Sequence, residues 1–350
     1  MLLYLHIPFC DSKCSYCAFN SYTNLHGLRV NYMKALAKQL QDDLKHYQIT
    51  TLSSIFIGGG TPSTVPPALY KELFEILSPY ISDTLEITTE ANPNSATKEW
   101  LQGMFNLGVN RVSFGVQSFD QEKLQFLNRA HTPQNAIDAI HNAQAVGFKN
   151  ISLDLIYATQ LDTKELLEND LTTAFALPIN HLSAYALTIE EGTPFEKTPK
   201  VASEDESLTT WLFETINKHG FIQYEISNFG SYQSRHNQGY WKHEEYLGVG
   251  AGAVGYINQR RLYPHKDVQA YIDDPLFKEE ESLGIDDIKM EKVLLGLRSS
   301  LGFFLDILNE GEKKRLQILL DENKLFEDEQ KLIINKNYLL ADELALFILN

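Results

Sequence analysis

The strongest constraint on the fold is an alternation of short apolar runs with segments of helical periodicity through the first two thirds of the chain. Runs rich in apolar and β-branched residues predict strands at residues 2–7, 53–57, 85–89, 111–116, 151–157 and 181–187. Helical periodicity between these runs predicts helices at residues 32–44, 66–77, 98–107, 135–146 and 164–176. This order is typical of parallel strands joined by right-handed crossovers.

The alternation continues into an expected helix near residues 204–218 and an expected strand near residues 221–226. We therefore predict an α/β fold, an incomplete (β/α)6-type TIM-like barrel. A doubly wound sheet is the alternative. The chain lacks the dinucleotide-binding fingerprint of that fold, because Gly58-Gly59-Gly60 is followed by Thr-Pro rather than by a helix-opening glycine.

The pattern changes near residue 245, where a glycine-rich stretch at residues 247–255 is followed by polar loops. Beyond it we expect helical segments around residues 288–297, 304–308 and 310–321, and short strands around residues 331–335. We therefore predict two domains, a barrel over residues 1–245 and a small helical or winged-helix-like appendage over residues 246–350.

The charge balance limits the classes of partner. The chain has 46 acidic and 30 basic residues and a formal net charge of -16, so its overall field repels nucleic acid and anionic lipid headgroups. No run of 18 or more apolar residues occurs, and Met1 is not followed by the features of a signal peptide. We expect a cytoplasmic protein that does not act on nucleic acid and whose membrane contact is peripheral.

The 3 cysteines lie together, as Cys10, Cys14 and Cys17. Soft thiolates in this arrangement select zinc or an iron-sulfur cluster. A structural zinc ion needs four ligands, so His6 or another histidine would have to complete its site. Three thiolates on a four-iron cluster instead leave one iron open for chemistry. The Cys-x3-Cys-x2-Cys spacing resembles the signature of the radical S-adenosylmethionine (SAM) superfamily, in which the methionine amino and carboxylate groups chelate that iron.

Polar residues follow the expected strands at the end where the active sites of barrels gather. Gly59 and Gly60 would let backbone groups approach the methionine part of SAM, and Thr61 adds a hydroxyl. The remaining candidates can bind ribose hydroxyls, the ammonium or the carboxylate of SAM: Glu90, Gln117, Arg129 and Asp154. Each alone is more simply a capping or salt-bridge residue, but their shared end of the barrel favours a binding site.

The sequence closely resembles, over nearly its whole length, the radical SAM group that contains oxygen-independent coproporphyrinogen III oxidase and the haem chaperone HemW. The resemblance rests on Tyr4-Leu-His6-Ile-Pro8-Phe9-Cys10, Gly58-Gly59-Gly60-Thr61-Pro62-Ser63, Arg111-Val-Ser-Phe-Gly115-Val-Gln117-Ser-Phe119, Leu127-Asn128-Arg129 and Asp154-Leu-Ile-Tyr157. It implies SAM contacts at Tyr4, Tyr16, Gly59, Gly60, Thr61, Glu90, Gln117, Arg129, Asp154, Ala186 and Val254. The chain departs from the group at Ala158-Thr159-Gln160, where the family usually shows Gly-Leu-Pro.

Two departures from the oxidase pattern favour the chaperone side of the group. The oxidase has a further cysteine two positions after the third ligand, where this chain has Phe19. The oxidase pattern also includes an extension before the first strand, whereas this chain starts essentially at that strand.

A motif near the end of the expected barrel points the same way. His236-Asn237-Gln238-Gly239-Tyr240-Trp241 resembles the His-Asn-x-x-Tyr-Trp motif of the chaperones. The resemblance implies haem binding by His236, Asn237, Tyr240 and Trp241, with His236 as a candidate axial ligand and Arg235 as a candidate propionate partner. Without the resemblance, this string more simply packs at the edge of a core.

These features together predict a haem chaperone with a [4Fe-4S] cluster and SAM as cofactors and haem as cargo. Its expected partners are haem-requiring recipient proteins, including respiratory enzymes of the membrane. The alternative is an oxygen-independent coproporphyrinogen III oxidase, in which SAM cleavage starts an oxidative decarboxylation.

Overall fold

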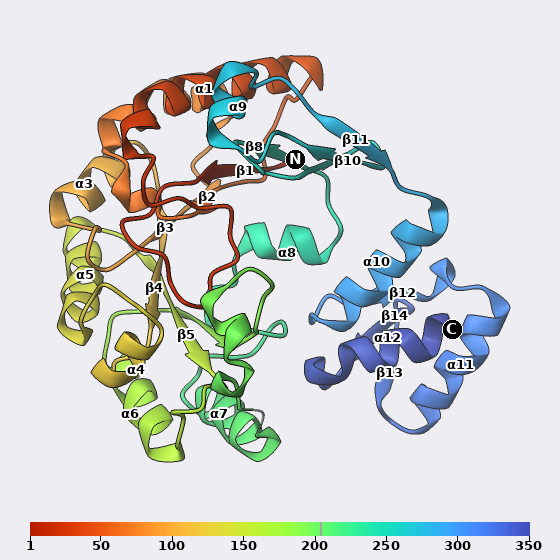
Figure 1. The fold of residues 1–350 in the computed structure, drawn as a ribbon. Coiled ribbons are helices and arrows are strands. Elements are labelled where there is room, and N and C mark those ends of the chain that lie inside the picture. Colours follow the sequence, from red (N-terminus) through yellow and green to blue (C-terminus); the bar gives the residue numbers. More distant parts are fainter. Residues whose placement is uncertain (204) are drawn as a thin grey trace.

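The computed structural model describes residues 1–203 and 205–350, and it is built on one curved sheet (Figure 1). The 11 strands of this sheet lie in the order β11-β10-β9-β8-β1-β2-β3-β4-β5-β6-β7. Their bounds are β1 Leu2–Ile7, β2 Ser54–Gly59, β3 Glu86–Ala91, β4 Arg111–Gln117, β5 Asn150–Tyr157, β6 His181–Ala186, β7 Asn228–Gly230, β8 Tyr246–Val249, β9 Gly255–Ile257, β10 Arg260–Tyr263 and β11 Glu279–Ser282.

Strands β8 and β1 to β6 pair in parallel, and the strands at both edges pair antiparallel. The sheet therefore stays open, as expected for an incomplete barrel. The α/β class and the parallel core predicted from the sequence are confirmed.

The helices that connect the parallel strands cover the outer face of the sheet (Figure 1). These helices and their neighbours are α1 Arg29–His46, α2 Lys71–Leu77, α3 Lys98–Asn106, α4 Gln121–Phe126, α5 Pro133–Val146, α6 Lys164–Phe175, α7 Glu206–Lys218, α8 Arg235–Trp241 and α9 Val268–Asp273. Threonine N-caps define where three of these helices begin. Thr97, Thr132 and Thr163 accept hydrogen bonds from backbone N–H groups in the first turns of α3, α5 and α6. The apolar faces behind these caps pack on the strands and form one large core.

The C-terminal region has its own core. It consists of α10 Ile285–Leu297, α11 Glu310–Asp321 and α12 Ala341–Leu349 around a small antiparallel sheet of β12 Phe303–Phe304, β14 Leu332–Asn335 and β13 Leu325–Glu327. It lies beside the open side of the barrel, next to α8 (Figure 1). Backbone hydrogen bonds from Ile226 to Arg298 and from Ser300 to Tyr224 join the two parts.

The expected domain boundary at residue 245/246 does not coincide with a break in the sheet. Strand β8 pairs in parallel with β1, and β9, β10 and β11 extend the same sheet to Ser282. The glycine-rich stretch contains a tight reversal instead of a linker: a Cβ at Gly248 would lie 2.2 Å from the carbonyl oxygen of Val254. We propose that the smaller domain begins at α10.

Other local expectations also need correction. Residues 221–226 do not form a strand but make isolated bridges. Strand β6 pairs with β5 on one side, and on its other side it pairs with β7, which runs antiparallel to it. The expected helix at 304–308 is a short strand followed by a 3-10 turn over Leu305–Ile307. The expected start of the helix at Glu204 lies outside the described residues. Within residues 1–203 and 205–350, no helix combines the length and apolarity needed to cross a bilayer.

Candidate functional site

Two adjoining cavities lie within the curve of the sheet. The larger, of about 610 Å³, is at the carboxyl ends of the parallel strands. The smaller, of about 500 Å³, extends from there between β1, β2 and α8 toward the C-terminal region. Both volumes are typical of small-molecule sites. Phe19, Gly59 and Glu90 line both cavities, so these residues stand where the two meet.

The cysteine loop follows β1 and is anchored along its length. Tyr22 donates a backbone hydrogen bond to Pro8 and accepts one from Cys10, at 2.8 and 3.0 Å, which closes the loop on itself. Ser15 donates to the carbonyl of Leu127 at 3.2 Å, so the loop is also held against the segment after α4. All three cysteines line the larger cavity: Cys10, Cys14 and Cys17.

The surroundings of these thiols fit metal-bound thiolates. The Thr61 hydroxyl donates to Cys10 Sγ at 3.3 Å, and Arg129 Nη1 lies 3.2 Å from Cys14 Sγ. Burial raises the pKa of the Cys10 thiol, and the Thr61 hydrogen bond opposes that rise. A Cβ at Gly60 would lie 3.1 Å from Cys10 Sγ, so the glycine leaves room beside the sulfur.

The thiols do not meet at one point. In the described part of the chain, no three His, Cys, Asp or Glu side chains form a group that could hold a single metal ion. Thiolates of a four-iron cluster bind different iron atoms and need no common point. Three thiolate donors facing a cavity therefore fit such a cluster with one open iron.

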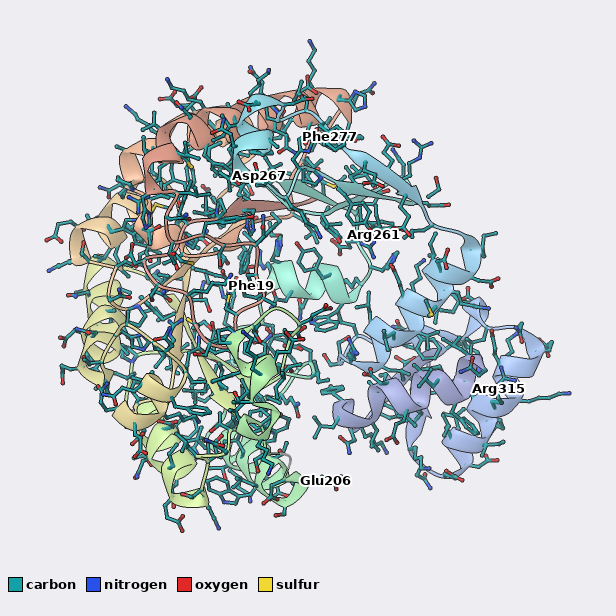
Figure 2. The ribbon with its side chains drawn as sticks, in the orientation of Figure 1. Phe19, Glu206, Arg261, Asp267, Phe277 and Arg315 are labelled. Carbon is teal, nitrogen blue, oxygen red and sulfur yellow. The ribbon has the colours of Figure 1, made fainter. Side chains whose placement is uncertain are left out.

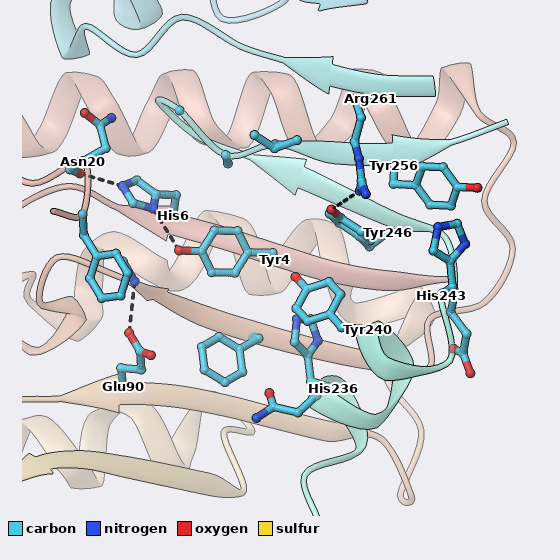
Figure 3. Close-up of a pocket in the computed structure, with 18 of the residues that line it drawn as sticks. Tyr4, His6, Asn20, Glu90, His236, Tyr240, His243, Tyr246, Tyr256 and Arg261 are labelled. Carbon is cyan, nitrogen blue, oxygen red and sulfur yellow. Dashed lines mark hydrogen bonds between the residues drawn. The ribbon is translucent and has the colours of Figure 1, made fainter. Parts of the chain in front are cut away.

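Two partly buried carboxyl groups face the larger cavity. Burial, and next the charge of Asp154, raise the pKa of Glu90 to about 7. Burial also raises the pKa of Asp154, which accepts a hydrogen bond from Ser113 at 3.3 Å. Gly59 has a φ of +111°, and its N–H donates to Glu90 Oε2 at 3.1 Å (Figure 3). This pair of acids favours a ligand that brings positive charge or hydroxyl donors.

Arg129 and Gln117 also line the larger cavity. Arg129 Nη2 donates to Asn92 Oδ1 at 2.6 Å and to the Gly115 carbonyl, while its buried Nε has no partner among the described residues. The register of β4 against β5 shifts between Gly115 and Gln117, which ends the strand with Gln117 at the cavity. Asn92 also donates to the Thr61 hydroxyl at 3.3 Å. Asn92 was not among the residues expected to contact SAM, although its position after a strand was a usable signal.

The structure divides the residues expected to contact SAM between the two cavities. Those that line the larger cavity are Tyr16, Gly59, Gly60, Thr61, Glu90, Gln117, Arg129, Asp154 and Ala186. Tyr4 and Val254 line the smaller cavity instead. Tyr4 donates to, or accepts from, His6 Nδ1 at 2.9 Å and so belongs to the inner wall of the barrel (Figure 3).

His236 lines the smaller cavity (Figure 3). Its Nδ1 is 2.7 Å from the Ser54 hydroxyl, while Nε2 is buried and has no partner in the described residues. The ring stacks on Phe56 at 5.0 Å and meets the edge of Tyr240 at 4.7 Å. Burial, followed by the charge of Arg111, lowers the pKa of His236 to about 3, so the imidazole is neutral at pH 7.

Helix α8 presents this histidine because a buried carboxylate holds its amino end. Glu86 accepts from the backbone N–H groups of Arg235 and His236 at 2.8 and 3.1 Å. Asn237 and Tyr240 also line the cavity, whereas Trp241 is not among the described residues that line it. The Arg235 guanidinium donates to the carbonyl of Thr84, so it is already engaged elsewhere.

The fold and the cysteine loop define a radical SAM-type protein. The family model of the radical SAM superfamily matches residues 4–172. Among solved structures, coproporphyrinogen III oxidase (HemN) from Escherichia coli superimposes with a TM-score of 0.84 over 99% of this chain and 89% of that one, at 20% identity.

Curated relatives give the particular family. The heme chaperone HemW of Bacillus subtilis (strain 168) is 33% identical over 85% of this chain and 83% of its own length. The heme chaperone HemW of Escherichia coli (strain K12) is 39% identical over 73% of this chain and 70% of its own. The chain belongs to the HemW family.

Proposed function

We propose that this protein is a haem chaperone that carries a [4Fe-4S] cluster and SAM, binds haem in the smaller cavity and delivers it to haem-requiring proteins, including respiratory enzymes of the membrane. The observation that carries the proposal is His236 Nε2, a buried nitrogen without a partner in residues 1–203 and 205–350, at a cavity that adjoins the one lined by the cysteines. The proposed setting is the cytoplasm, with peripheral membrane contact through a recipient protein.

In the larger cavity, Cys10, Cys14 and Cys17 would hold the cluster. Such a cluster would supply an open iron to which the amino and carboxylate groups of SAM can bind. The protein's part is positioning: Thr61 and Arg129 direct donors at two of the sulfurs. The adjacent carboxyl groups and Gln117 offer partners for the ribose hydroxyls and the ammonium.

In the smaller cavity, His236 would ligate the haem iron. A neutral imidazole with a free nitrogen is the form that binds iron, and the lowered pKa of His236 keeps it in that form. Tyr240 and the other aromatic side chains of the cavity provide apolar faces for the porphyrin. Asn237 would contact the haem edge, and Trp241 would act through the packing of α8.

The second candidate is an oxygen-independent coproporphyrinogen III oxidase. It is favoured by the contact between the two cavities at Glu90, Gly59 and Phe19, because a porphyrin in the smaller cavity would lie next to SAM in the larger one. Phe19 is 67% exposed in this shared region and brings an apolar ring where the oxidase pattern has a cysteine.

One sample can distinguish the two functions. The protein is reconstituted anaerobically, its iron content is measured, and it is then titrated with haem and assayed for turnover of coproporphyrinogen III. Stoichiometric haem binding without decarboxylation is the expected result. Decarboxylation would instead identify an oxidase, and the absence of haem binding by fully reconstituted protein would defeat the chaperone proposal.

A further inference from the structure

Arg261 forms an ion pair with a carboxylate from the C-terminal region. Its Nη2 lies 2.7 Å from both carboxylate oxygens of Glu291 on α10, and Nε2 of His243 lies 2.6 Å from Oε2 of the same group. Burial raises the pKa of Glu291, but the hydrogen bonds from Arg261 and His243 outweigh it and the net pKa is lowered. Glu291 is therefore a carboxylate anion held by two donors.

Arg261, the cation of this pair, stands at one end of the smaller cavity (Figure 3). Arg261, His243 and Leu295 line that end, and Leu295 follows Glu291 by one turn of α10. The side chains of Arg261 and Glu291 are 20% and 24% exposed, so solvent and ligands can reach them. Figure 2 shows Arg261 on the side of the sheet that faces the C-terminal helices.

A row of aromatic side chains links this end of the cavity to His236. The Tyr240 ring lies 4.7 Å from the rings of both His236 and Tyr246. The Tyr246 hydroxyl in turn accepts a hydrogen bond from Arg261 at 2.7 Å. These apolar ring faces suit a porphyrin that reaches from His236 to Arg261. Among the described lining residues, Arg261 alone carries a permanent positive charge, while Glu90 and Glu244 would repel propionates.

We propose that Arg261 and His243 form the propionate subsite of the smaller cavity, and that Glu291 occupies this subsite until a porphyrin carboxylate replaces it. The inference rests on the proposed haem-binding function and adds to it a recognition site and an internal competitor. Arg261 suits this role because a guanidinium binds one carboxylate as well as another through paired hydrogen bonds.

When a porphyrin carboxylate replaces Glu291, no buried charge at the subsite is left without a partner. Arg261 keeps its hydrogen bond to the Tyr246 hydroxyl, at 2.7 Å, and its position 5.0 Å from the centre of the Tyr256 ring. Displaced Glu291 is already partly exposed and can turn to water. Because Glu291 belongs to α10, its release removes one of the contacts that hold the C-terminal region against the sheet.

The test compares two variants with two matched controls. Glu291→Gln removes the competing anion, and Arg261→Gln removes the subsite. Arg260→Gln and Glu280→Gln are the controls, because Arg260 and Glu280 form a similar pair at 2.7 Å on the exposed face of the neighbouring strands. Each full-length protein, reconstituted anaerobically, is titrated with haem, with metal-free protoporphyrin and with the dimethyl ester of haem.

We expect Glu291→Gln to bind haem and free protoporphyrin about tenfold more tightly, and Arg261→Gln about tenfold more weakly, since hydrogen bonds to charged groups have this size. The dimethyl ester should bind all proteins alike, and the controls should match wild type. Equal affinities of wild type and Arg261→Gln for both free porphyrins would overturn the propionate subsite while leaving haem binding at His236 intact. Equal affinities of wild type and Glu291→Gln would overturn Glu291 as its competitor.

The metal-free porphyrin separates this inference from the proposed function. It cannot be ligated through iron, so its affinity reports the propionate contact and is independent of the axial ligand. Failure of wild-type protein to bind haem defeats the chaperone, whereas an Arg261 dependence for metal-free porphyrin still supports the subsite. Hydrogen exchange in α10 should rise when haem binds, and unchanged protection there would overturn the displacement of Glu291.

Discussion

His236 and His181 both place Nδ1 2.7 Å from a serine hydroxyl, Ser54 for the first and Ser152 for the second. They differ at the other ring nitrogen. Nε2 of His181 pairs with the Tyr224 hydroxyl at 2.7 Å, whereas Nε2 of His236 has no partner in the described part of the chain. Burial lowers the pKa of both, so both are neutral. The unpaired nitrogen is what distinguishes a candidate ligand from a structural histidine.

The first prediction uses this difference. His236→Ala should lose the haem absorbance band of an imidazole-ligated iron and weaken haem binding at least about tenfold, because a coordination bond is removed. His181→Ala removes an equally buried imidazole and should leave the spectrum of bound haem unchanged, even where it lowers stability. An unaltered haem spectrum in folded His236→Ala protein would eliminate His236 as the axial ligand.

The second prediction concerns the pH dependence of cluster-free protein. The folded-state pKa of Glu90 is about 7, above the ordinary value of 4.5, so the folded state binds the extra proton between these limits. Stability should therefore fall as pH rises from about 4.5 to 7 on account of this group. Glu90→Gln removes the effect and should be more stable than wild type by up to about 3 kcal/mol above pH 7, with no difference below pH 4.5.

Urea denaturation at pH 4.5, 6 and 8 measures this difference. Glu99→Gln is the control, because Glu99 is fully exposed on α3 and should show no comparable gain at high pH. A wild-type protein whose stability relative to Glu90→Gln is constant across this range would show that Glu90 titrates normally.

The parallel sheet could be predicted because each of its strands carries its own signal. Strand β1, for example, buries Leu3, Leu5 and Ile7 on one face and Leu2 and His6 on the other, as expected of a strand covered on both faces. The site at the larger cavity could be predicted as well, since polar residues that follow parallel strands meet at one edge of the sheet. The residues that resemble the family motif therefore came together largely as expected.

The smaller cavity could not be assembled from local pattern. Its wall depends on pairing between β8 and β1, which are separated by most of the barrel, and on Glu86 at the amino end of α8. Neither contact can be predicted from a short stretch of sequence, because each joins residues far apart along the chain. The Arg261–Glu291 pair likewise joins a strand of the sheet to a helix of another core, and the sequence separates them by 30 positions.

The third prediction concerns Ala158, which stands where the family usually has glycine. Ala158 has a φ of +61°, a conformation that favours glycine, and glycine is the residue usual in the family at this position. Ala158→Gly should therefore stabilise the protein by up to about 1 kcal/mol, measured by denaturant unfolding. Gln160, where the family usually has proline, is a departure that stabilises this loop. Its N–H donates a hydrogen bond to the Val201 carbonyl at 2.8 Å, which proline could not make.

Ala202→Gly is the matched control for Ala158. Ala202 pairs with the same loop through a bridge to Thr159 and has an ordinary φ of -88°. Glycine there should cost about 0.5–1 kcal/mol through the entropy of the unfolded chain. The strain argument fails if both alanines lose stability equally on replacement by glycine.

The fourth prediction concerns a buried ion pair near the larger cavity. The side chains of Lys123 and Asp162 are 0% and 1% exposed, with Nζ and Oδ1 2.5 Å apart. Asp162 also accepts from the Thr159 N–H at 2.8 Å, so the pair ties α4 to the loop after β5. Lys123→Met would leave Asp162 buried without its cation.

Lys123→Met should therefore lower the free energy of unfolding by about 3–5 kcal/mol, the usual result of breaking a buried pair. Lys218→Met is the control, because Lys218 and its partner Glu214 are 73% and 59% exposed, and its loss should change stability by less than about 0.5 kcal/mol. Because Lys123 anchors the segment between Gln117 and Arg129, the variant should also bind SAM more weakly, whereas Lys218→Met should bind it normally. A Lys123→Met protein as stable as wild type would show that Asp162 finds another partner or a proton when its cation is removed.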